Sequence, residues 1–456
     1  MDARAASYYV AEKKIYPRGV RGRFARLRVV AMCALLGLFY LMPWVHWNGR
    51  QAVLFDLPAR KFYVFGLVMW PQDFIYLTAL LIIAALSLFF FTTLAGRLWC
   101  GYACPQTVWT EAFLWMERFA EGDRNERMKL DRSPWSVRKV SRKATKQLVW
   151  MSFSLWTGIT FVGYFAPIET LIASTATLSL GPWETFWSLF YGFATYGNAG
   201  FLREQVCKYM CPYARFQSAM FDRDTLIITY DAARGEPRWV KRRGTETDSG
   251  KRGDCIDCTW CVQVCPTGID IRKGLQNECI ACAACIDACD AVMDKVGSPR
   301  GLIRYATQNS LEHQPTHVLR PRVLIYGALI TALIAAFGIS LARRTPLGVD
   351  VIRDRNALYR LLDDGRAENV YDVKIINKSE QPHRFVVSVH GKGELTLDPA
   401  PAVFDVASGE VLPVVVRVRR DAYEPLGSQD IELRVQAQDA PRMTATTIAR
   451  FLGPNR

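Results

Sequence analysis

The stretch Cys255-Ile-Asp-Cys258-Thr-Trp-Cys261-Val-Gln-Val-Cys265-Pro266 decides the organisation of this chain, and its cysteine spacing recurs across residues 279–289. Two runs of the form C-x-x-C-x-x-C-x-x-x-C are the ligand pattern of two [4Fe–4S] clusters in a two-cluster ferredoxin, in which the fourth cysteine of each run ligates the other cluster. The expected ligand sets are Cys255, Cys258, Cys261 and Cys289 for one cluster, and Cys279, Cys282, Cys285 and Cys265 for the other. Zinc modules usually present separated cysteine pairs instead. The runs therefore predict a protein that moves single electrons.

The remainder of the 456-residue chain is typical of a membrane protein with basic loops. Half of the residues are hydrophobic, yet the formal net charge is +14. Five apolar runs approach or exceed the length needed to cross a hydrocarbon core of about 30 Å. These runs are Val29–Trp47, Phe74–Ala95, Leu148–Phe165, Trp183–Phe201 and Val323–Leu341. We therefore expect an integral membrane α-helical core of about five transmembrane helices that carries a ferredoxin-like insert.

Lys and Arg placement predicts the orientation. Basic residues concentrate in 1–28, 97–147 and 201–322, and are sparse in 48–73 and 168–182. By the positive-inside rule, the N-terminus and the clusters are cytoplasmic and the C-terminal domain is periplasmic. All cysteines precede residue 290, which agrees with reduced thiols inside the cell. The expected location is the bacterial cell inner membrane, as a multi-pass protein.

The basic stretch Arg238–Arg252 could suggest nucleic acid, but no nucleic-acid motif accompanies it. Basic runs that flank membrane helices more often face anionic lipid. The sequence therefore predicts a lipid bilayer as partner and no nucleic acid.

Residues 345–456 change character. Period-two hydrophobicity and β-branched residues mark strands, with breakers between them. The clearest strands are Val370–Ile376, Arg384–His390, Val411–Arg419 and Ile431–Ala437. About seven such strands predict an all-β immunoglobulin-like sandwich, although the usual cysteine pair is missing. His383 and His390 are interpreted as strand or surface residues.

The expected division of the chain follows from these patterns. It comprises a cytoplasmic tail (1–28), a four-helix membrane core (29–222), a cytoplasmic domain with two [4Fe–4S] clusters (223–319), a fifth transmembrane helix (320–344) and a periplasmic immunoglobulin-like domain (345–456).

A second internal repeat follows each expected pair of membrane spans. Cys100-Gly-Tyr-Ala-Cys104-Pro105 recurs as Cys207-Lys-Tyr-Met-Cys211-Pro212. We expect a new helix with the proline at its first position, which places Cys104 at a helix N-terminus and predicts a lowered thiol pKa. Such soft thiolates suit Cu(I), a further iron–sulfur cluster or a redox-active dithiol. Cys33, alone in the first span, is interpreted as a packing residue.

These residues together resemble the CcoG family, also called FixG or RdxA, whose members are accessory proteins for assembly of cbb3-type cytochrome c oxidase. The most specific parts are Asp56-Leu-Pro-Ala-Arg-Lys61, the segments 99–109 and 207–217, and the two four-cysteine runs. The second run ends Cys289-Asp290 instead of Cys-Pro, which departs from the general ferredoxin pattern at a local turn.

The resemblance implies an inner-membrane protein with two [4Fe–4S] clusters that reduces Cu(II) to Cu(I) for delivery to the oxidase. The hypothesis is that an unknown cytoplasmic donor reduces the clusters, which then reduce copper held at the catalytic thiols. These thiols are Cys100, Cys104, Cys207 and Cys211. The implied partners are the cbb3-type oxidase and its copper-delivery factors.

Two other functions stay open at this point. One is a quinol- or flavin-linked membrane ferredoxin subunit of a respiratory chain, and the other is a non-catalytic oxidase assembly scaffold. Whether the chain is an enzyme, as a cupric reductase acting in assembly, depends on which of the three holds.

Overall fold

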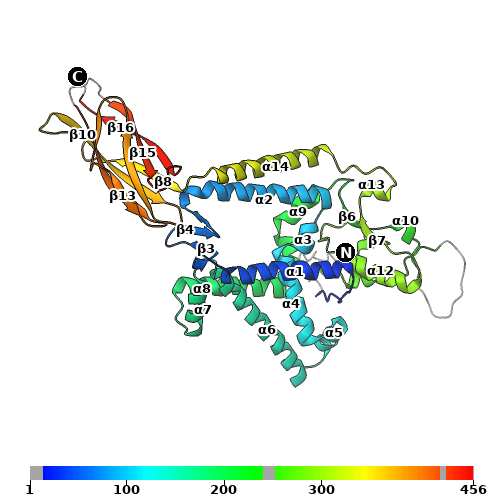
Figure 1. Cartoon of the computed structure of the whole chain (residues 1–456). Helices are drawn as coiled ribbons and strands as arrows, with labels where there is room; N and C mark the ends of the chain where they lie inside the picture. The colour runs from blue at the N-terminus through cyan, green and yellow to red at the C-terminus, as the bar shows by residue number, and fades with distance from the viewer. Residues whose placement is uncertain (1–13, 240–251, 422–427, 455–456) are drawn as a thin grey trace, which may run out of the picture. The chain divides into compact units, whose positions relative to one another are not determined.

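The computed structural model describes residues 14–239, 252–421 and 428–454 of the chain (Figure 1). The chain divides into two units, one formed by Met1–Val45 with Leu77–Ile334 and the other by His46–Tyr76 with Ala335–Arg456. The start of the expected N-terminal tail and most of the basic stretch Arg238–Arg252 lie outside the described residues.

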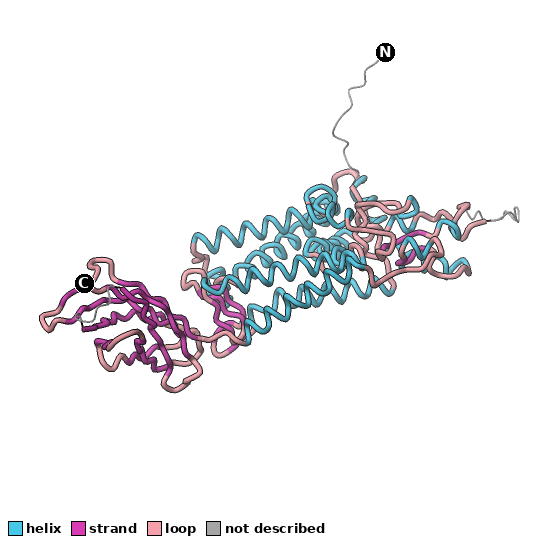
Figure 2. The backbone as a smooth tube through the Cα atoms, turned by 90° about the horizontal axis from the view of Figure 1, so that it is seen from above, coloured by secondary structure: helices cyan, strands magenta, loops and turns pink. Residues whose placement is uncertain are grey.

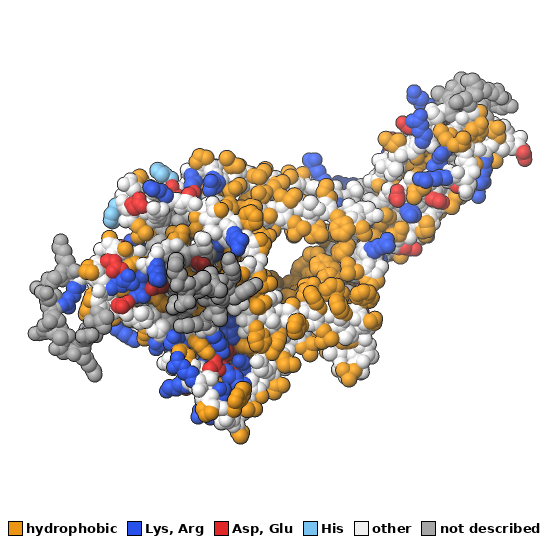
Figure 3. All heavy atoms as spheres, turned by 180° about the vertical axis from the view of Figure 1, so that it is seen from behind, with side chains coloured by type: hydrophobic (Ala, Val, Ile, Leu, Met, Phe, Trp, Pro, Cys, Tyr) orange, Lys and Arg blue, Asp and Glu red, His pale blue; other side chains and the backbone are white. Residues whose placement is uncertain are grey.

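Three helices in the described part of the chain are long and apolar enough to cross a membrane. They are α1 (Arg23–Leu41), α2 (Phe74–Ala95) and α14 (Pro321–Ala342), and the apolar segments containing them have mean hydropathies of 1.8, 2.6 and 2.2. Few of their side chains are buried in the isolated chain, and hydrophobic side chains cover much of the helical unit's face in Figure 3. An exposed apolar surface of this extent is typical of helices that contact lipid.

Two other predicted spans correspond to α6 (Val137–Val162) and α8 (Pro182–Thr195). α6 begins at Val137, well before the expected Leu148. Its first half carries Lys and Arg, so the apolar run marks only the second half of the helix. α8 continues into a π-helical segment, η3 (Tyr196–Leu202). The two helices pack backbone against backbone. A Cβ on Gly158 would lie 2.0 Å from the carbonyl oxygen of Ser188, so only glycine fits at this crossing.

Short elements complete the helical unit. They are α3 (Leu98–Tyr102), α4 (Pro105–Glu121), α5 (Arg124–Arg132), α7 (Ile168–Ala176), η4 (Val206–Met210), α9 (Pro212–Ala219), α10 (Ala232–Gly235), α11 (Trp260–Gln263), η5 (Ile271–Lys273), α12 (Ala284–Val296) and α13 (Gln308–Leu311). Antiparallel pairing of β6 (Ile227–Tyr230) with β7 (Ile303–Ala306) brings together the two ends of the segment that carries the cysteine runs.

The second unit consists mainly of two antiparallel sheets, whose strands are coloured magenta in Figure 2. One sheet has the order β12-β14-β10-β8, with β9 paired to β10, and the other has the order β13-β11-β15-β16. Their bounds are β8 Leu347–Arg353, β9 Arg360–Leu361, β10 Arg366–Asn377, β11 His383–His390, β12 Leu395–Asp398, β13 Val403–Val406, β14 Val411–Asp421, β15 Ser428–Ala437 and β16 Thr444–Leu452. The inward side chains of both sheets share one hydrophobic core. The four strands expected from period-two alternation all form, since alternation places one face of each strand in that core.

Residues 46–76 behave differently from expectation. The sequence predicts that they belong to the membrane core 29–222, whereas the structure groups them with residues 335–456. They form two small sheets, from β1 (His46–Trp47), β2 (Arg50–Gln51), β3 (Val53–Asp56), β4 (Lys61–Val64) and β5 (Leu67–Met69), followed by a 3₁₀ turn, η2 (Pro71–Asp73). The physical reason is a buried ion-pair centre: Asp73 contacts Arg344 at 2.6 Å and Lys378 at 3.2 Å.

Candidate functional site

The eight cysteines of the two runs surround two small cavities. One cavity is lined by Cys255, Cys258, Cys261 and Cys289, together with residues that include Tyr230 and Arg272. The other is lined by Cys265, Cys279, Cys282 and Cys285, and Cys261 lies on the wall common to both. Each cavity therefore combines three cysteines of one run with the fourth cysteine of the other.

The fourth cysteines reach their cavities by different backbone routes. Pro266 follows Cys265 beyond the end of α11, whereas Cys289 lies inside α12, which continues to Val296. Asp290 occupies the position of the missing proline, and its carboxylate accepts a hydrogen bond from the Gly301 N–H at 3.0 Å. The departure from Cys-Pro thus replaces a turn with a continuous helix and leaves Cys289 at the cavity.

Both cysteine loops contain the same unusual backbone conformation. Asp257 and Thr259 flank Cys258 with φ of 49° and 57°, and Ala281 and Ala283 flank Cys282 with φ of 53° and 58°. Non-glycine residues rarely adopt this left-handed region, so four instances at equivalent positions indicate a loop shaped by what it encloses. The duplication visible in the sequence is therefore also a duplication of backbone geometry.

The donor set fits iron–sulfur clusters better than a single metal ion. Among the described residues, no three His, Cys, Asp or Glu side chains converge closely enough to hold one ion. A [4Fe–4S] cluster binds each thiolate through a different iron atom, so its ligands stand further apart. Burial raises the pKa of Cys261 to about 12 and that of Cys282 to about 11. Bound metal would supply positive charge that stabilises thiolates at these positions.

The duplicated C-x-Y-x-C-P motifs have the local structure that the sequence predicts. In the first copy Cys100 lies in α3, the helix ends, and α4 begins with Pro105 directly after Cys104. In the second copy Cys207 lies in η4, and α9 begins with Pro212 after Cys211. A proline at the first helical position costs no hydrogen bond, because that N–H has no partner within the helix.

The four motif cysteines lie in one neighbourhood. Burial is the main reason that the pKa of Cys100 is raised to about 12. Negative charge on the nearby Cys104, Cys207 or Cys211 also raises this pKa. The Cys100 thiol donates to the amide oxygen of Gln217 at 3.1 Å, and Gln217 is 1% exposed. The topology therefore brings together thiols that are far apart in the chain.

The expected lowering of the Cys104 pKa is wrong. Burial raises this pKa above its ordinary value, although the backbone N–H groups of Thr107 and Gln106 act in the opposite direction. Burial raises the pKa of Cys207 as well, to about 11. The helix N-terminus is present, but desolvation of the thiolate outweighs its field.

The first motif packs directly on the loop of the second cysteine run. A Cβ on Gly101 would lie 2.8 Å from the carbonyl oxygens of both Ile280 and Ala281, which are in the loop between Cys279 and Cys282. Cys100 and Cys207 also pack against the hydrophobic cluster that contains Cys282. Gly101 is therefore the residue that permits close approach of the motif to the cavity of the second run.

Arg97, directly before α3, connects the first motif to the second cysteine run and to α9. Its guanidinium is buried, with the whole residue 4% exposed, and donates to the carbonyl oxygens of Asn277 and Ala214. It also lies 3.5 Å from the carbonyl oxygen of Cys279. Its positive charge lowers the pKa of Cys100, Cys207 and Cys279, against the larger effect of burial. Arg97 thus provides the counter-charge for both groups of thiols.

Sequence reasoning missed Arg97, and it missed two contacts from the N-terminal segment. Asp287 of α12 accepts hydrogen bonds from the backbone N–H groups of Phe24 (3.1 Å) and Ala25 (2.6 Å), at the start of α1. Arg28 donates to the carbonyl oxygen of Cys282. Arg28 directly precedes the predicted span Val29–Trp47, and the sequence does not distinguish it from the neighbouring Arg23 and Arg26.

The sequence matches three described protein families. Residues 202–308 match the family "4Fe-4S dicluster domain", and residues 77–122 match "4Fe-4S binding domain". Residues 337–454 match "IG-like fold at C-terminal of FixG, putative oxidoreductase". The first match spans all eight clustered cysteines, and the second spans Cys100 and Cys104.

Similar proteins cover almost the whole chain. Protein RdxB of Cereibacter sphaeroides is 42% identical, over 96% of this chain and 95% of its own length. Nitrogen fixation protein FixG of Rhizobium meliloti is 38% identical, over 92% of this chain and 86% of its own. Protein RdxA of C. sphaeroides is 39% identical, over 95% of both. The solved structure of a FixG-related protein from Vibrio parahaemolyticus is 28% identical and covers 24% of this chain and 98% of its own, with a TM-score of 0.22.

Proposed function

Because the chain belongs to the family of RdxA, RdxB and FixG, we propose that this iron–sulfur electron-transfer protein reduces Cu(II) to Cu(I) for maturation of a cbb3-type cytochrome c oxidase. The observation that carries the proposal is the contact between the motif around Cys100 and the loop around Cys282, made through Gly101. An electron acceptor at the motif would be adjacent to an electron carrier in the second cavity.

Two clusters are assigned to the two cavities. Cys255, Cys258, Cys261 and Cys289 hold the first, and Cys279, Cys282, Cys285 and Cys265 hold the second. The lining of the cavities and the repeated left-handed loop residues support this assignment. When bound, the clusters supply one-electron transfer. The protein's own part is to hold them in a buried site beside the motif.

Copper is the substrate and binds at Cys100, Cys104, Cys207 and Cys211. Sulfur ligands favour Cu(I) over Cu(II), so thiols stabilise the product of the reaction. Arg97 offsets part of the negative charge that forms when the thiols ionise.

We assign five membrane spans: α1, α2, α6, α8 and α14. The close crossing of α6 and α8 through Ser154, Gly158, Ser188 and Gly192 supports the inclusion of these two helices, because small residues four apart are typical of packed membrane helices. With basic loops on the inside, the N-terminus and the clusters are cytoplasmic and the immunoglobulin-like sandwich is periplasmic, in a bacterial inner membrane.

The experiment replaces the four motif cysteines by serine in the full-length protein. Anaerobically purified, dithionite-reduced protein is mixed with Cu(II), and Cu(I) is measured with a cuprous-specific chelator. The variant should lose copper reduction while both cluster signals in electron paramagnetic resonance stay unchanged. Cys33→Ser, which removes the exposed lone thiol of α1, is the matched control. Copper reduction that survives in the fourfold variant would disprove the assigned site.

The same protein separates the proposal from its alternatives. A quinol-linked carrier would oxidise a quinol and leave Cu(II) untouched. A scaffold would bind the oxidase, and its cluster signals would not respond to copper.

A further inference from the structure

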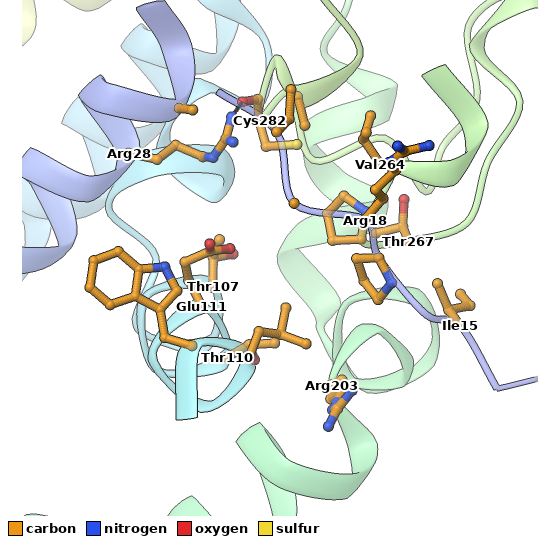
Figure 4. Close-up of a pocket in the computed structure, with 18 of the residues that line it drawn as sticks. Ile15, Arg18, Arg28, Thr107, Thr110, Glu111, Arg203, Val264, Thr267 and Cys282 are labelled. Atoms are coloured by element: carbon orange, nitrogen blue, oxygen red, sulfur yellow. Dashed lines mark hydrogen bonds between the residues drawn. The ribbon is translucent and has the colours of Figure 1, made fainter. Parts of the chain in front are cut away.

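A large cavity in the helical unit adjoins the proposed copper site, which contributes Cys207 to its lining (Figure 4). Its volume is about 570 Å³, within the range of sites for small molecules and cofactors. The N-terminal segment 15–29, helix α4 and the cysteine-run domain enclose it. Its lining includes Cys207 of the second motif and Cys282 of the second cysteine run. A molecule bound here would therefore touch both groups of thiols.

The cavity is strongly basic. Six arginines line it, against the three carboxylates of Glu111, Asp123 and Glu204. Three of these arginines are already paired: Arg118 with Glu111 at 3.3 Å, and Arg127 and Arg203 with the buried Glu117 at 2.8 and 2.9 Å. The other three are Arg18, Arg21 and Arg28.

These three arginines have no ion-pair partner among the described residues. Arg18 lies over the ring of Trp260 with 4.2 Å between its guanidinium carbon and the ring centre, and Arg28 donates to the carbonyl oxygen of Cys282. Figure 4 shows Arg28 beside Cys282, and Arg18 beside Val264 and Thr267 on another side of the cavity. Unpaired guanidinium groups of this kind recognise phosphate, which they bind with two parallel hydrogen bonds.

The positive charge excludes some occupants and favours others. A neutral quinol would leave the guanidinium groups desolvated without a partner. Gln106 and Thr107 add the electropositive first turn of α4. Val20, Leu114, Trp115 and Ile280 supply apolar and aromatic surface for a planar ring. The cavity therefore suits an anion that carries a ring.

We propose that this cavity binds a phosphorylated flavin, which serves as the electron donor of the protein. The inference rests on the proposed function and names the donor for the same reaction. A nicotinamide transfers hydride as an electron pair, whereas a flavin releases electrons singly, as the one-electron carriers of this chain require. The reaction balances when one reduced flavin loses two electrons and two protons and two Cu(II) ions each gain one electron.

The test uses full-length protein in lipid nanodiscs under anaerobic conditions. Flavin mononucleotide is titrated and its fluorescence quenching is followed, with flavin adenine dinucleotide, riboflavin and a reduced nicotinamide as parallel probes. The variant Arg18→Gln/Arg21→Gln removes two guanidinium groups that pair with no carboxylate of the described residues. The matched control is Arg300→Gln, an exposed arginine that pairs with Asp294 and does not line the cavity. Iron content and visible absorbance verify that each variant is folded.

We expect saturable binding of the phosphorylated flavins, with riboflavin at least tenfold weaker. The double variant should raise Kd at least tenfold, which corresponds to about 1.4 kcal/mol. Photoreduced flavin mononucleotide should bleach the cluster absorbance of the wild-type protein. The rate of bleaching should be at least tenfold lower in the double variant. Dithionite should reduce both proteins equally, and Arg300→Gln should behave as wild type in every assay.

The flavin site would be overturned by any of three results: riboflavin binds as tightly as flavin mononucleotide, the double variant binds flavin mononucleotide with an unchanged Kd, or only the nicotinamide binds. If dithionite-reduced protein converts Cu(II) to Cu(I) without any flavin binding, only this inference fails. If flavin binds as expected but dithionite-reduced protein leaves Cu(II) unchanged, the proposed copper reduction fails instead.

Discussion

Replacing Arg97 by Gln removes a buried positive charge between the motif cysteines and the second cysteine run. The guanidinium lies 3.5 Å from the carbonyl oxygen of Cys279, a residue that lines the second cavity. At an effective dielectric constant of about 20, two unit charges about 8 Å apart interact by about 2 kcal/mol. For a one-electron couple this energy corresponds to about 90 mV.

The sign follows from electrostatics. Reduction adds negative charge to the second cavity, and a nearby cation stabilises the reduced form. Arg97→Gln should therefore lower the reduction potential of the second cluster by about 90 mV, while the first cluster changes less because, among the described residues, the hydrogen bonds of Arg97 go to the second run and to α9. The measurement is a redox titration of full-length protein followed by electron paramagnetic resonance.

Arg97→Lys is the matched control, because it keeps the charge and loses part of the hydrogen bonding. Both variants deprive buried carbonyl groups of donors, at about 1–3 kcal/mol each, so unfolding free energies should be measured in parallel. Equal shifts in the two variants, or a rise in potential on Arg97→Gln, would refute the electrostatic reasoning.

Three further predictions concern buried contacts. Glu117→Gln should destabilise the protein by about 3–5 kcal/mol in chemical denaturation, since it removes the partner of the buried Arg127 and Arg203. Burial alone would raise the Glu117 pKa, but the two arginines outweigh burial and lower that pKa. The stabilisation by Glu117 is therefore present above the ordinary glutamate pKa and is lost as the pH falls through the lower pKa of the folded state. Acid denaturation monitored by circular dichroism should show this loss in the wild-type protein and not in Glu117→Gln. Gly158→Leu should separate α6 from α8 and lower the thermal midpoint of detergent-solubilised protein, whereas an unchanged midpoint would argue against the close crossing. Asp287→Ala should remove the hydrogen bonds that cap the start of α1 and lower the unfolding free energy by about 1–2 kcal/mol. Asp287→Asn should recover part of this loss, and equal unfolding free energies of the two variants would contradict the capping role.

The sequence predicted the elements whose pattern is local. The β-strands around 370–376 and 431–437 follow from alternation of buried and exposed side chains, and each forms within a residue or a few of its expected bounds. The turn and new helix at Cys104-Pro105 follow from the backbone restriction that proline imposes. The apolar runs likewise predicted α1, α2 and α14, because membrane spans are recognised by composition alone.

Other predictions failed where distant contacts decide the outcome. Residues 46–76 joined the C-terminal unit through Asp73, whose partners Arg344 and Lys378 are remote in sequence. The Cys104 pKa rose because neighbouring segments bury the thiol, and burial cannot be read from a helix N-terminus. The charged first half of α6 is helical because it packs and pairs through residues such as Lys143 and Lys146, so apolarity alone misplaced its start.

The sequence by itself determined the cofactor class and the family, because the cysteines of each cluster loop are spaced within a few residues of one another and that spacing survives in the linear chain. The tertiary structure alone decided that Gly101 lies against the loop of Ile280 and Ala281, that Arg97 and Arg28 reach the same loop, and that a basic cavity opens beside it. These features depend on close approach between segments far apart in the chain. No local periodicity encodes such an approach, since it results from the packing of the whole unit.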